Sequence, residues 1–343
     1  MKVLFIGGTG NISLASTRLA AERNVELTLL RRGRRTAALP MNVGTIVADI
    51  ADEAAVAQAL GNRVFDAVVD WVAFTPADVE RDIRLFRGRA RQFIFISSAS
   101  AYQRPVGHYL ITESTPLANP YWQYSRDKIA CEERLMKAYR EEQFPITIVR
   151  PSLTYGEAQI VLAVNSWQKS YTAVDRMRRG KKVIVPGDGT SLWAITHNSD
   201  FAEGLVGLLG QQQAIGHAFH ITSDEVMTWD QFYNITAHAA GVEAKIVHIP
   251  SDFIGACIPD EVGSLTGDKA SSVVFDNGKI KRFVPGYYAK TSFAQGIQRT
   301  IEWFDADPRR KEIDEDANAS WDNLIHAYEC GLTEALRSFG HKV

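Results

Sequence analysis

A tyrosine and a lysine stand four residues apart in Tyr124-Ser125-Arg126-Asp127-Lys128, which places both side chains on one face of a helix. A lysine ammonium held roughly 4 Å from a phenol favours the phenolate by about 4 kcal/mol when the effective dielectric constant is about 20. Such an interaction can lower a tyrosine pKa from about 10 to near 7. A phenolate of this kind exchanges a proton with an alcohol at neutral pH, so Tyr124 and Lys128 form a candidate acid/base pair. The alternative is an exposed helical pair without chemistry.

The amino-terminal residues have the pattern of a strand, a glycine-rich turn and a helix. The apolar run Lys2–Ile6 suits a buried parallel strand, and Gly7-Gly8-Thr9-Gly10-Asn11-Ile12-Ser13 leads into the helical pattern of residues 14–20. Glycines let the backbone approach a pyrophosphate, whose charge the helix amino terminus attracts. A tight turn without a ligand is the alternative. Ser13 replaces the third glycine of the motif and is small enough to preserve close packing.

A basic run, Arg31 to Arg35, follows the second expected strand at residues 26–30. Dinucleotide-binding folds that select NAD usually place an acid here, where it bonds the adenosine ribose hydroxyls. Arg31 and Arg32 instead suit a 2′-phosphate, so the sequence favours NADP over NAD. A solvated basic loop is the alternative interpretation.

Strand and helix patterns alternate through the first half of the chain. The further expected strands cover residues 44–49, 66–72 and 92–98, and the helices between them cover 52–60 and 76–86. This alternation predicts an α/β fold with a Rossmann-type, doubly wound parallel sheet, which binds ligands at the carboxyl ends of its strands. Ser97 and Ser98 would lie at such an end.

Nearly the whole chain resembles an extended short-chain dehydrogenase/reductase of the NAD-dependent epimerase/dehydratase family. The matching features occur in the family's order, which makes the match more specific than any single motif. They are Gly7, Gly8 and Gly10, then Ser98 before Tyr102, then Tyr124 with Lys128, then Arg150 to Gly156, and finally Gly187-Asp188-Gly189 through His197 and Asp200. The resemblance implies an NAD(P)-dependent epimerase or dehydrogenase.

The resemblance assigns catalytic roles to Ser98, Tyr124 and Lys128. Tyr124, as phenolate, would take the proton of a substrate hydroxyl while hydride leaves the same carbon for the nicotinamide. Ser98 would hydrogen-bond the developing carbonyl or alkoxide, and Lys128 would lower the tyrosine pKa and bind the nicotinamide ribose. The expected cofactor contacts are Gly7, Thr9, Gly10, Asn11, Ile12, Arg31, Arg32, Asp49, Ile50, Trp71, Val72, Tyr124, Lys128 and Pro151.

Departures from the family's patterns reduce the number of reactions that we expect of this site. Ala99-Ser100 stands where members that dehydrate nucleotide sugars commonly carry an Asp-Glu pair and decarboxylating members carry a glutamate. Some epimerase-reductases use a cysteine close to the active serine, and none of Cys131, Cys257 and Cys330 fits that position. We therefore expect simple reversible oxidation of a secondary hydroxyl, or oxidation followed by re-reduction on the other face.

The expected substrate contacts, Ser100, Leu153 and Trp193, are also atypical. Leu153 and Trp193 stand where many sugar-nucleotide epimerases have an asparagine and a diphosphate-binding arginine. An indole in place of a charged clamp suggests a less anionic substrate than a sugar nucleotide, such as a sugar, nucleoside or other polyol stacked on the ring. The other interpretation of Trp193 is a core aromatic.

Composition sets broad limits on function. The 343 residues carry a net charge of −2 and have a pI near 6.5, which gives no global attraction to nucleic acid or membrane. Three scattered cysteines argue against a disulfide framework and a zinc cluster, and no metal is expected. Since the sequence opens on a strand pattern, we expect neither a signal peptide nor a spanning helix, and a cytoplasmic location.

The alternation loosens after residue 156, which predicts two domains. Residues 1–156 would bind the dinucleotide and 157–343 mainly the substrate, with segments near 190–222 returning to the first domain. His217 and His220 flank an apolar run and are expected to be structural. The other expectations are helices over 159–179 and 199–210, strands at 183–186 and 217–221, an N-cap at Thr228, and a core-facing helix over 318–339.

Two further classes of function are open on the same fold. Atypical members of the superfamily include chloroplast stem-loop RNA-binding proteins, a role that the basic runs Arg31 to Arg35 and Arg176 to Lys182 would support. Other members are cofactor sensors that have lost the active tyrosine, and the retained Ser98, Tyr124 and Lys128 argue against that class. The expected partner is a small-molecule substrate rather than nucleic acid, and the resemblance implies a homodimer.

Overall fold

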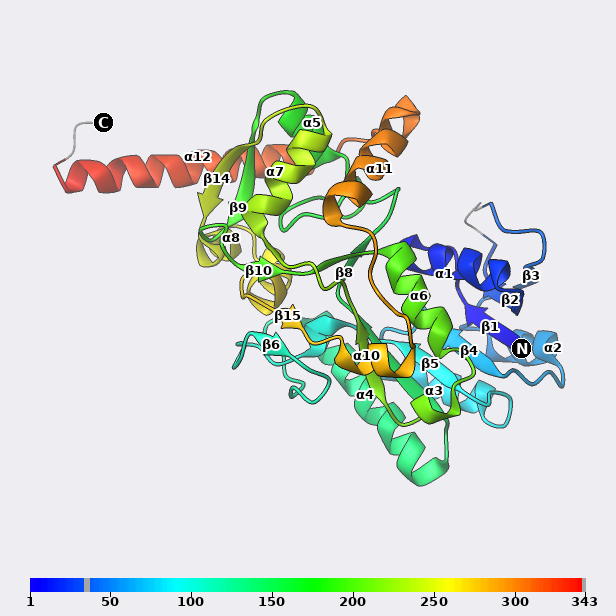
Figure 1. Cartoon of the computed structure of the whole chain (residues 1–343). Coiled ribbons are helices and arrows are strands. Elements are labelled where there is room, and N and C mark those ends of the chain that lie inside the picture. The colour runs from blue at the N-terminus through cyan, green and yellow to red at the C-terminus, as the bar shows by residue number, and fades with distance from the viewer. Residues whose placement is uncertain (34–37, 341–343) are drawn as a thin grey trace. The chain divides into compact units, whose positions relative to one another are not determined.

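The computed structural model describes residues 1–33 and 38–340 (Figure 1). Within these residues the chain divides into two compact units, which we call the first unit and the second unit. The first unit comprises Met1–Gly156, Ala194–Glu225 and Val274–Thr291. The second comprises Glu157–Trp193, Val226–Val273 and the described residues from Ser292 onward.

A seven-stranded parallel sheet forms the centre of the first unit. Its strand order is β12-β7-β5-β4-β1-β2-β3, and every neighbouring pair is parallel. The order reverses between β1 and β4, which is where doubly wound sheets open a ligand crevice. The expected Rossmann-type sheet is thereby confirmed. The strands are β1 (Lys2–Ile6), β2 (Glu26–Arg31), β3 (Gly44–Val47), β4 (Ala67–Asp70), β5 (Phe93–Ile96), β7 (Ile146–Pro151) and β12 (Ala218–Ile221).

Each face of this sheet packs against its own set of helices. Val3 and Phe5 of β1 belong to one core, whereas Leu4 and Ile6 belong to the core on the opposite face. Burial on both faces explains why the strands read as continuous apolar runs. The first core is covered by α1 (Asn11–Glu22), α6 (Asn198–Leu208) and α10 (Gly278–Phe283), and the second by α2 (Glu53–Leu60), α3 (Pro76–Phe86) and α4 (Gln123–Glu142).

Short elements complete the first unit. In parallel pairs, β8 lies beside β11 and β6 beside β15. The strand expected over 217–221 forms as β12 and joins the edge of the main sheet beside β7. The short elements are η1 (Ala99–Ala101), β6 (Leu110–Ile111), β8 (Leu153–Tyr155), β11 (Ile195–His197), η2 (Gln212–Ala214) and β15 (Val274–Phe275).

The second unit is built from two small strand pairs and several helices. Strand β9 pairs in parallel with β14, and β10 pairs antiparallel with β13. Thr228 caps α7 in a reciprocal arrangement with Gln231, as the sequence predicts. The strands are β9 (Lys182–Pro186), β10 (Leu192–Trp193), β13 (Met227–Thr228) and β14 (Lys245–Ile249). The helices are α5 (Thr172–Arg178), α7 (Trp229–Ala239), α8 (Ser251–Cys257), α9 (Glu261–Ser264), η3 (Leu265–Lys269), α11 (Phe293–Asp305), η4 (Pro308–Arg310) and α12 (Glu315–Ser338).

The prediction of a helix over 159–179 is wrong for most of this range, because only Thr172–Arg178 is helical. Residues 160–164 are five consecutive buried positions, a pattern that a one-sided helix cannot produce. The Asn165 amide donates to the carbonyl oxygens of Ile160 and Ser170, so a side chain holds the backbone outside a helix. The apolar run is therefore an irregular buried segment.

The expected carboxy-terminal helix is present as α12, but only its first half faces a core. Asn318, Trp321, Leu324 and Ile325 are buried in the second unit. Further along, Leu332 is 49% exposed. The apolar periodicity over 318–339 thus predicted the helix correctly and the burial of its second half wrongly.

Candidate active site

The turn after β1 depends on two glycines with positive φ. Gly7 has a φ of +98° and Gly8 a φ of +100°, a conformation that residues with side chains rarely adopt. A Cβ atom on Gly8 would lie 2.8 Å from a methyl carbon of Leu29. Ser13, at the third glycine position, accepts a hydrogen bond from the N–H of the N-cap residue Gly10 at 2.8 Å, as the N3 residue of a capping box does. The replacement of glycine by serine thus strengthens the helix start.

This turn borders a cleft of about 690 Å³ at the carboxyl ends of β1, β2, β3 and β4. Nine of the expected cofactor residues line it: Gly7, Thr9, Gly10, Arg31, Arg32, Asp49, Ile50, Trp71 and Val72. The lining also includes Phe74, Asp78 and Arg81, which the sequence did not indicate. The other expected contacts lie outside the lining, namely Asn11 and Ile12 in the first turn of α1, Tyr124 and Lys128 on α4, and Pro151 at the end of β7.

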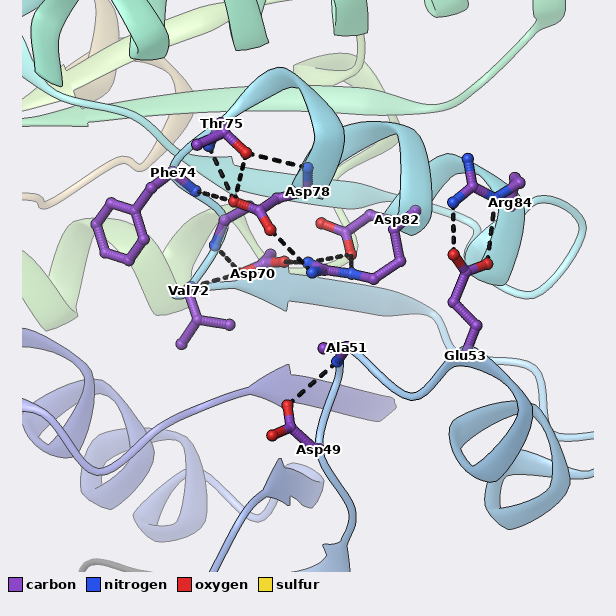
Figure 2. Close-up of polar contacts among 12 residues, drawn as sticks. Asp49, Ala51, Glu53, Asp70, Val72, Phe74, Thr75, Asp78, Asp82 and Arg84 are labelled. Atoms are coloured by element: carbon purple, nitrogen blue, oxygen red, sulfur yellow. Dashed lines mark hydrogen bonds and ion pairs between the residues drawn. The ribbon is translucent and has the colours of Figure 1, made fainter. Parts of the chain in front are cut away.

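The lining fits a dinucleotide. Trp71 lines the cleft, and its buried indole Nε1 has no hydrogen-bond partner among the described residues. The amino terminus of α1 attracts phosphate, and Arg31 and Arg32 add positive charge at the end of β2. Asp49, whose carboxylate accepts the Ala51 N–H at 3.2 Å, places an acceptor at the end of β3 (Figure 2).

Lys128 is buried in the first unit, with its ammonium fixed by two backbone carbonyls. Its Nζ donates to the oxygen of Ala73 at 2.7 Å and to that of Ile96 at 2.8 Å, which join it to the loop after β4 and to the end of β5. The ring centroids of Phe74 and Phe95 lie 4.6 and 4.8 Å from Nζ. Burial lowers the pKa of Lys128 to about 8.

Tyr124 lies one helical turn before Lys128, in the first turn of α4. The Lys128 Nζ is 5.8 Å from the centroid of the Tyr124 ring. The rings of Trp122 and Phe74 flank the tyrosine at centroid distances of 4.9 and 6.4 Å. The residue spacing read from the sequence therefore brings the phenol and the ammonium together among aromatic side chains.

Ser98 is half-buried and is the N-cap residue of η1, two residues after the end of β5. Its Oγ lies 2.9 Å from the Oγ of Ser100 and accepts the Ser100 N–H at 3.2 Å. The Ser125 hydroxyl donates in turn to the Ser100 Oγ at 2.8 Å. Ser100 was expected to contact substrate, but it is 4% exposed and lies one hydrogen bond behind Ser98.

Helix α4 is anchored to the sheet by a buried ion pair one turn beyond Lys128. The Arg150 guanidinium of β7 donates to both carboxylate oxygens of Glu132, with Nε to Oε1 at 2.9 Å. Burial opposes the charge on Arg150, yet the facing Glu132 raises its pKa above the ordinary value. The Tyr102 ring covers the guanidinium at 4.8 Å, and its hydroxyl bonds His220 at 3.0 Å. His220 is thus structural, as expected.

Two expected substrate contacts lie in different units. Leu153 belongs to β8 of the first unit and is partly buried. Trp193 belongs to the second unit, is 2% exposed and packs on Trp229 at a centroid distance of 5.5 Å. Both indole N–H groups donate to the backbone oxygen of Lys269. Of the two interpretations of Trp193, this packing favours a core aromatic over a stacking platform.

Sequence reasoning missed an acidic cluster beside the cleft, in which two of the three carboxylates are buried. Asp70, Asp78 and Asp82 surround the Arg81 guanidinium at the end of β4 and the start of α3 (Figure 2 shows the three carboxylates). A signal was present, because Asp70 ends an otherwise apolar buried strand and the spacing of Asp78 and Asp82 places both on one helical face. Ser125 was also missed, since a serine inside a helix carries no local signal.

The parallel sheet, the glycine turn and the cleft together define a dinucleotide-binding enzyme of the extended short-chain dehydrogenase/reductase type. The profile of the NAD dependent epimerase/dehydratase family matches residues 3–222, and the chain belongs to this family. The resemblance seen in the sequence is thereby confirmed.

Relatives of known activity are distant. The chain is 26% identical to 2′-dehydrokanamycin reductase of Streptomyces kanamyceticus over 290 residues, which span 84% of this chain and 80% of the relative. It is also 26% identical to the chloroplast stem-loop binding protein of 41 kDa b from Arabidopsis thaliana over 267 residues, 74% of this chain and 67% of the relative.

Solved structures share the fold at lower identity. The dTDP-glucose 4,6-dehydratase of Bacillus anthracis in complex with NAD matches with a TM-score of 0.72 and 18% identity, over 90% of this chain and 98% of that chain. The UDP-glucose 4-epimerase of Thermotoga maritima with UDP-glucose matches with a TM-score of 0.71 and 19% identity, over 89% and 99%.

Residues 1–33 and 38–340 contain neither a candidate metal cluster nor a candidate membrane-spanning helix. No cluster of three or more His, Cys, Asp or Glu side chains in these residues has an arrangement that would hold a metal ion. No helix in the same residues combines the length and apolar character that crossing a membrane requires. Cys131, Cys257 and Cys330 are free thiols, and burial raises the pKa of Cys131 to about 12.

Proposed function

We propose that this protein is an NAD(P)-dependent oxidoreductase or epimerase that acts on a secondary hydroxyl or ketone of a sugar or sugar-like substrate. The observation that carries the proposal is the position of the Lys128 ammonium, 5.8 Å from the Tyr124 ring centre and held by two carbonyls. An ammonium so close to a phenol favours the phenolate. Ser98 is tied by hydroxyl groups to Ser125, the neighbour of Tyr124 in α4.

The proposed mechanism assigns one task to each side chain. The nicotinamide of the cofactor supplies the hydride acceptor or donor. In oxidation, Tyr124 as phenolate takes the hydroxyl proton while the carbon loses its hydride, and the hydroxyl oxygen becomes a carbonyl. Ser98 donates a hydrogen bond to that oxygen, and Lys128 holds the tyrosine in its phenolate form. In reduction, Tyr124 returns the proton to the oxygen as hydride adds to the carbon.

We also propose NADP as the preferred dinucleotide. Arg31 and Arg32 line the cleft at the end of β2, where a guanidinium can pair with a 2′-phosphate. Of the acidic residues that line the cleft, Asp49 is the one nearest in sequence to Arg31 and Arg32, and it follows the next strand, β3.

For the substrate, we propose a ketone or alcohol on a sugar that lacks a nucleotide diphosphate. The Streptomyces relative is named a 2′-dehydrokanamycin reductase, and that name mentions no sugar nucleotide. Ala99 and Ser100 replace the acidic pair of dehydratases, so elimination of water has no obvious acid or base here. A sugar nucleotide is the second choice, since the matched epimerase and dehydratase structures are named for such substrates.

One assay separates these possibilities. Freshly purified protein is denatured, and any released dinucleotide is identified and quantified per chain. In a separate sample, the native protein is mixed with NADPH and one candidate substrate, and the oxidation of NADPH is followed. The candidates are 2′-dehydrokanamycin, simple keto sugars and nucleotide-linked keto sugars. Reduction that Tyr124→Phe abolishes supports the proposal. A tightly held, stoichiometric dinucleotide points to an epimerase cycle, and equal activity of Tyr124→Phe removes the proposed site.

The proposal extends to the assembly and to the second unit. We propose that residues 157–343, which the sequence assigns mainly to substrate binding, supply most of the substrate contacts. The resemblance further suggests a homodimer that pairs through α4, and the cytoplasmic location expected from the sequence pattern is part of the proposal. Sedimentation equilibrium measures the mass directly, and a monomer at all concentrations would exclude pairing.

RNA binding is a second candidate, because one relative is named a stem-loop binding protein. Of the two basic runs, Arg34 and Arg35 lie outside the described residues. The run from Arg176 to Lys182 is largely neutralised by carboxylates. The pairs are Arg176 with Asp322, Arg178 with Asp305, Arg179 with Asp175, Lys181 with Asp322 and Lys182 with Glu329. Steeply salt-dependent RNA retention that survives Tyr124→Phe would favour this class.

A further inference from the structure

The loop between β4 and α3 is held through four consecutive backbone N–H groups. Asp70 Oδ1 accepts from Val72 and from Ala73, the latter at 2.9 Å. Asp78 Oδ2 accepts from Phe74 at 3.0 Å and from Thr75 at 2.9 Å. Figure 2 shows both carboxylates pointing at the loop backbone. Two carboxylates therefore fix residues 72–75 from opposite ends.

Arg81 joins these two carboxylates. Its Nη1 lies 2.9 Å from Asp78 Oδ1, and its Nη2 lies 4.0 Å from Asp70 Oδ2. Its Nε and Nη2 both donate to Asp82 Oδ1, at 3.1 and 3.0 Å. The Arg81 side chain is 10% exposed, and those of Asp70 and Asp82 are fully buried. We call these four residues the Arg81 clasp.

The clasp places three carboxylates around one guanidinium. Burial raises the pKa of Asp82 well above its ordinary value, and the adjacent Asp70 carboxylate adds to the effect. The two carboxylates that hold the loop, Asp70 and Asp78, face the same guanidinium. A charged, buried group of this kind contributes little net stability compared with apolar packing. Asp78 also completes the capping box of α3, because its carboxylate accepts the Thr75 N–H while the Thr75 side chain caps the helix.

The loop that the clasp holds contacts both halves of the candidate active site. The carbonyl oxygen of Ala73 accepts the Lys128 Nζ at 2.7 Å, and the Phe74 ring lies 4.6 Å from the same atom. Val72 and Phe74 also line the dinucleotide cleft, together with Asp78 and Arg81 themselves. A shift of the loop would therefore move the Ala73 carbonyl that holds the Lys128 ammonium, and it would move the wall of the cleft at the same time.

We infer that Arg81 is a positioning residue, which acts through Asp70, Asp78 and the loop at 72–75 to set the place of the Lys128 ammonium beside Tyr124. This inference rests on the proposed function, in which Lys128 stabilises the phenolate. Four charged or titratable groups act on the Lys128 ammonium, namely Asp70, Asp78, Cys131 and Glu132. Tyr124, on the same face of α4, also lies beside it. Two of the four belong to the clasp, so the clasp also contributes to the field at the ammonium.

The test compares three variants in the presence of saturating NADP⁺. Arg81→Met removes the guanidinium, Arg81→Lys keeps the charge without the fork of donors, and Arg84→Met is the matched control. Arg84 lies on the same helix and pairs with Glu53 at the exposed surface (Figure 2). The two readouts are amide hydrogen exchange of residues 72–75 and the phenolate titration of Tyr124, obtained as the ultraviolet difference from Tyr124→Phe.

The clasp predicts a coupled result. Arg81→Met should speed amide exchange in the loop at least tenfold and raise the midpoint of the Tyr124 titration by about one pH unit. Arg81→Lys should show a smaller shift in the same direction, and Arg84→Met should change neither. If Arg81→Met does not fold, Arg81→Lys carries the test, and a wild-type titration for that variant overturns the inference.

Two other outcomes are informative. Faster exchange without a change in the Tyr124 titration would mean that the clasp is purely structural, which contradicts the inference. Failure of the proposed function looks different, because Tyr124→Phe would then turn over substrate at the wild-type rate. The exchange measurement uses bound NADP⁺ as its probe and does not depend on turnover.

Discussion

The hydroxyl of Ser125 donates to the Oγ of Ser100 across 2.8 Å, although the two residues belong to different elements. Both are buried, and Ser100 in turn shares a hydrogen bond with Ser98. If Ser100 passes its proton toward Ser98, the Ser98 oxygen accepts from the Ser100 hydroxyl and from the Ser100 N–H, and its own proton is free for a ligand. Hydrogen bonds in such a chain polarise one another, which makes Ser98 a stronger donor.

This chain predicts that Ser125→Ala slows hydride transfer about tenfold, which corresponds to one hydrogen bond of about 1.4 kcal/mol. Alanine fits a helix interior, so the fold should be unaffected. The check is single-turnover kinetics of Ser125→Ala, Ser98→Ala and the double variant. Additive effects of the two substitutions would show that Ser125 acts independently of Ser98.

Replacing Tyr124 by phenylalanine should lower turnover by about 10²- to 10⁴-fold, because the reaction loses its proton acceptor. Cofactor affinity, measured by titration with NADPH, should stay near that of the wild type. Tyr121→Phe is the matched control, since Tyr121 lies three residues earlier and is 37% exposed. Comparable turnover for both variants would reject Tyr124 as the acid/base.

Charge reversal at the end of β2 should change cofactor preference. Arg31→Asp combined with Arg32→Asn removes two charged donors, each of which contributes about 1.5 to 3 kcal/mol to binding a phosphate. NADP affinity should fall by about 100-fold or more, while NAD affinity changes little or rises. Dissociation constants for both dinucleotides provide the check, and an equal loss for the two would reject recognition of a 2′-phosphate.

Burial of Lys128 predicts a particular pH dependence of stability. Its pKa is lowered by burial from 10.5 in the unfolded chain to about 8 in the fold, so between these pH values the unfolded chain binds more protons. The free energy of unfolding should therefore rise with pH in this window, by up to about 3 kcal/mol. The measurement is urea unfolding of the wild type minus that of Lys128→Met from pH 7 to pH 10.5. A difference that falls over this range would contradict the buried ammonium.

Local patterns in the sequence predicted the regular elements well. The strand at Lys2–Ile6 and the helix at Pro76–Phe86 form over the expected residues, because apolar periodicity acts within a few residues. In the structure, Thr75 caps that helix locally. The segment 159–171 was missed, since its apolar residues follow the shape of a core rather than a helical period. The amide of Asn165, which holds this segment, gives no such signal in advance.

The sequence by itself determined the doubly wound sheet, the glycine turn at Gly7 and Gly8, and the four-residue spacing of Tyr124 and Lys128. These features depend on short-range sterics and periodicity, which a single strand or helix expresses alone. Only the tertiary structure decided what surrounds them. Asp70 and Arg81, or Ser100 and Ser125, meet because separate elements fold onto one another, and the free energy of such contacts depends on burial that no local window of sequence contains.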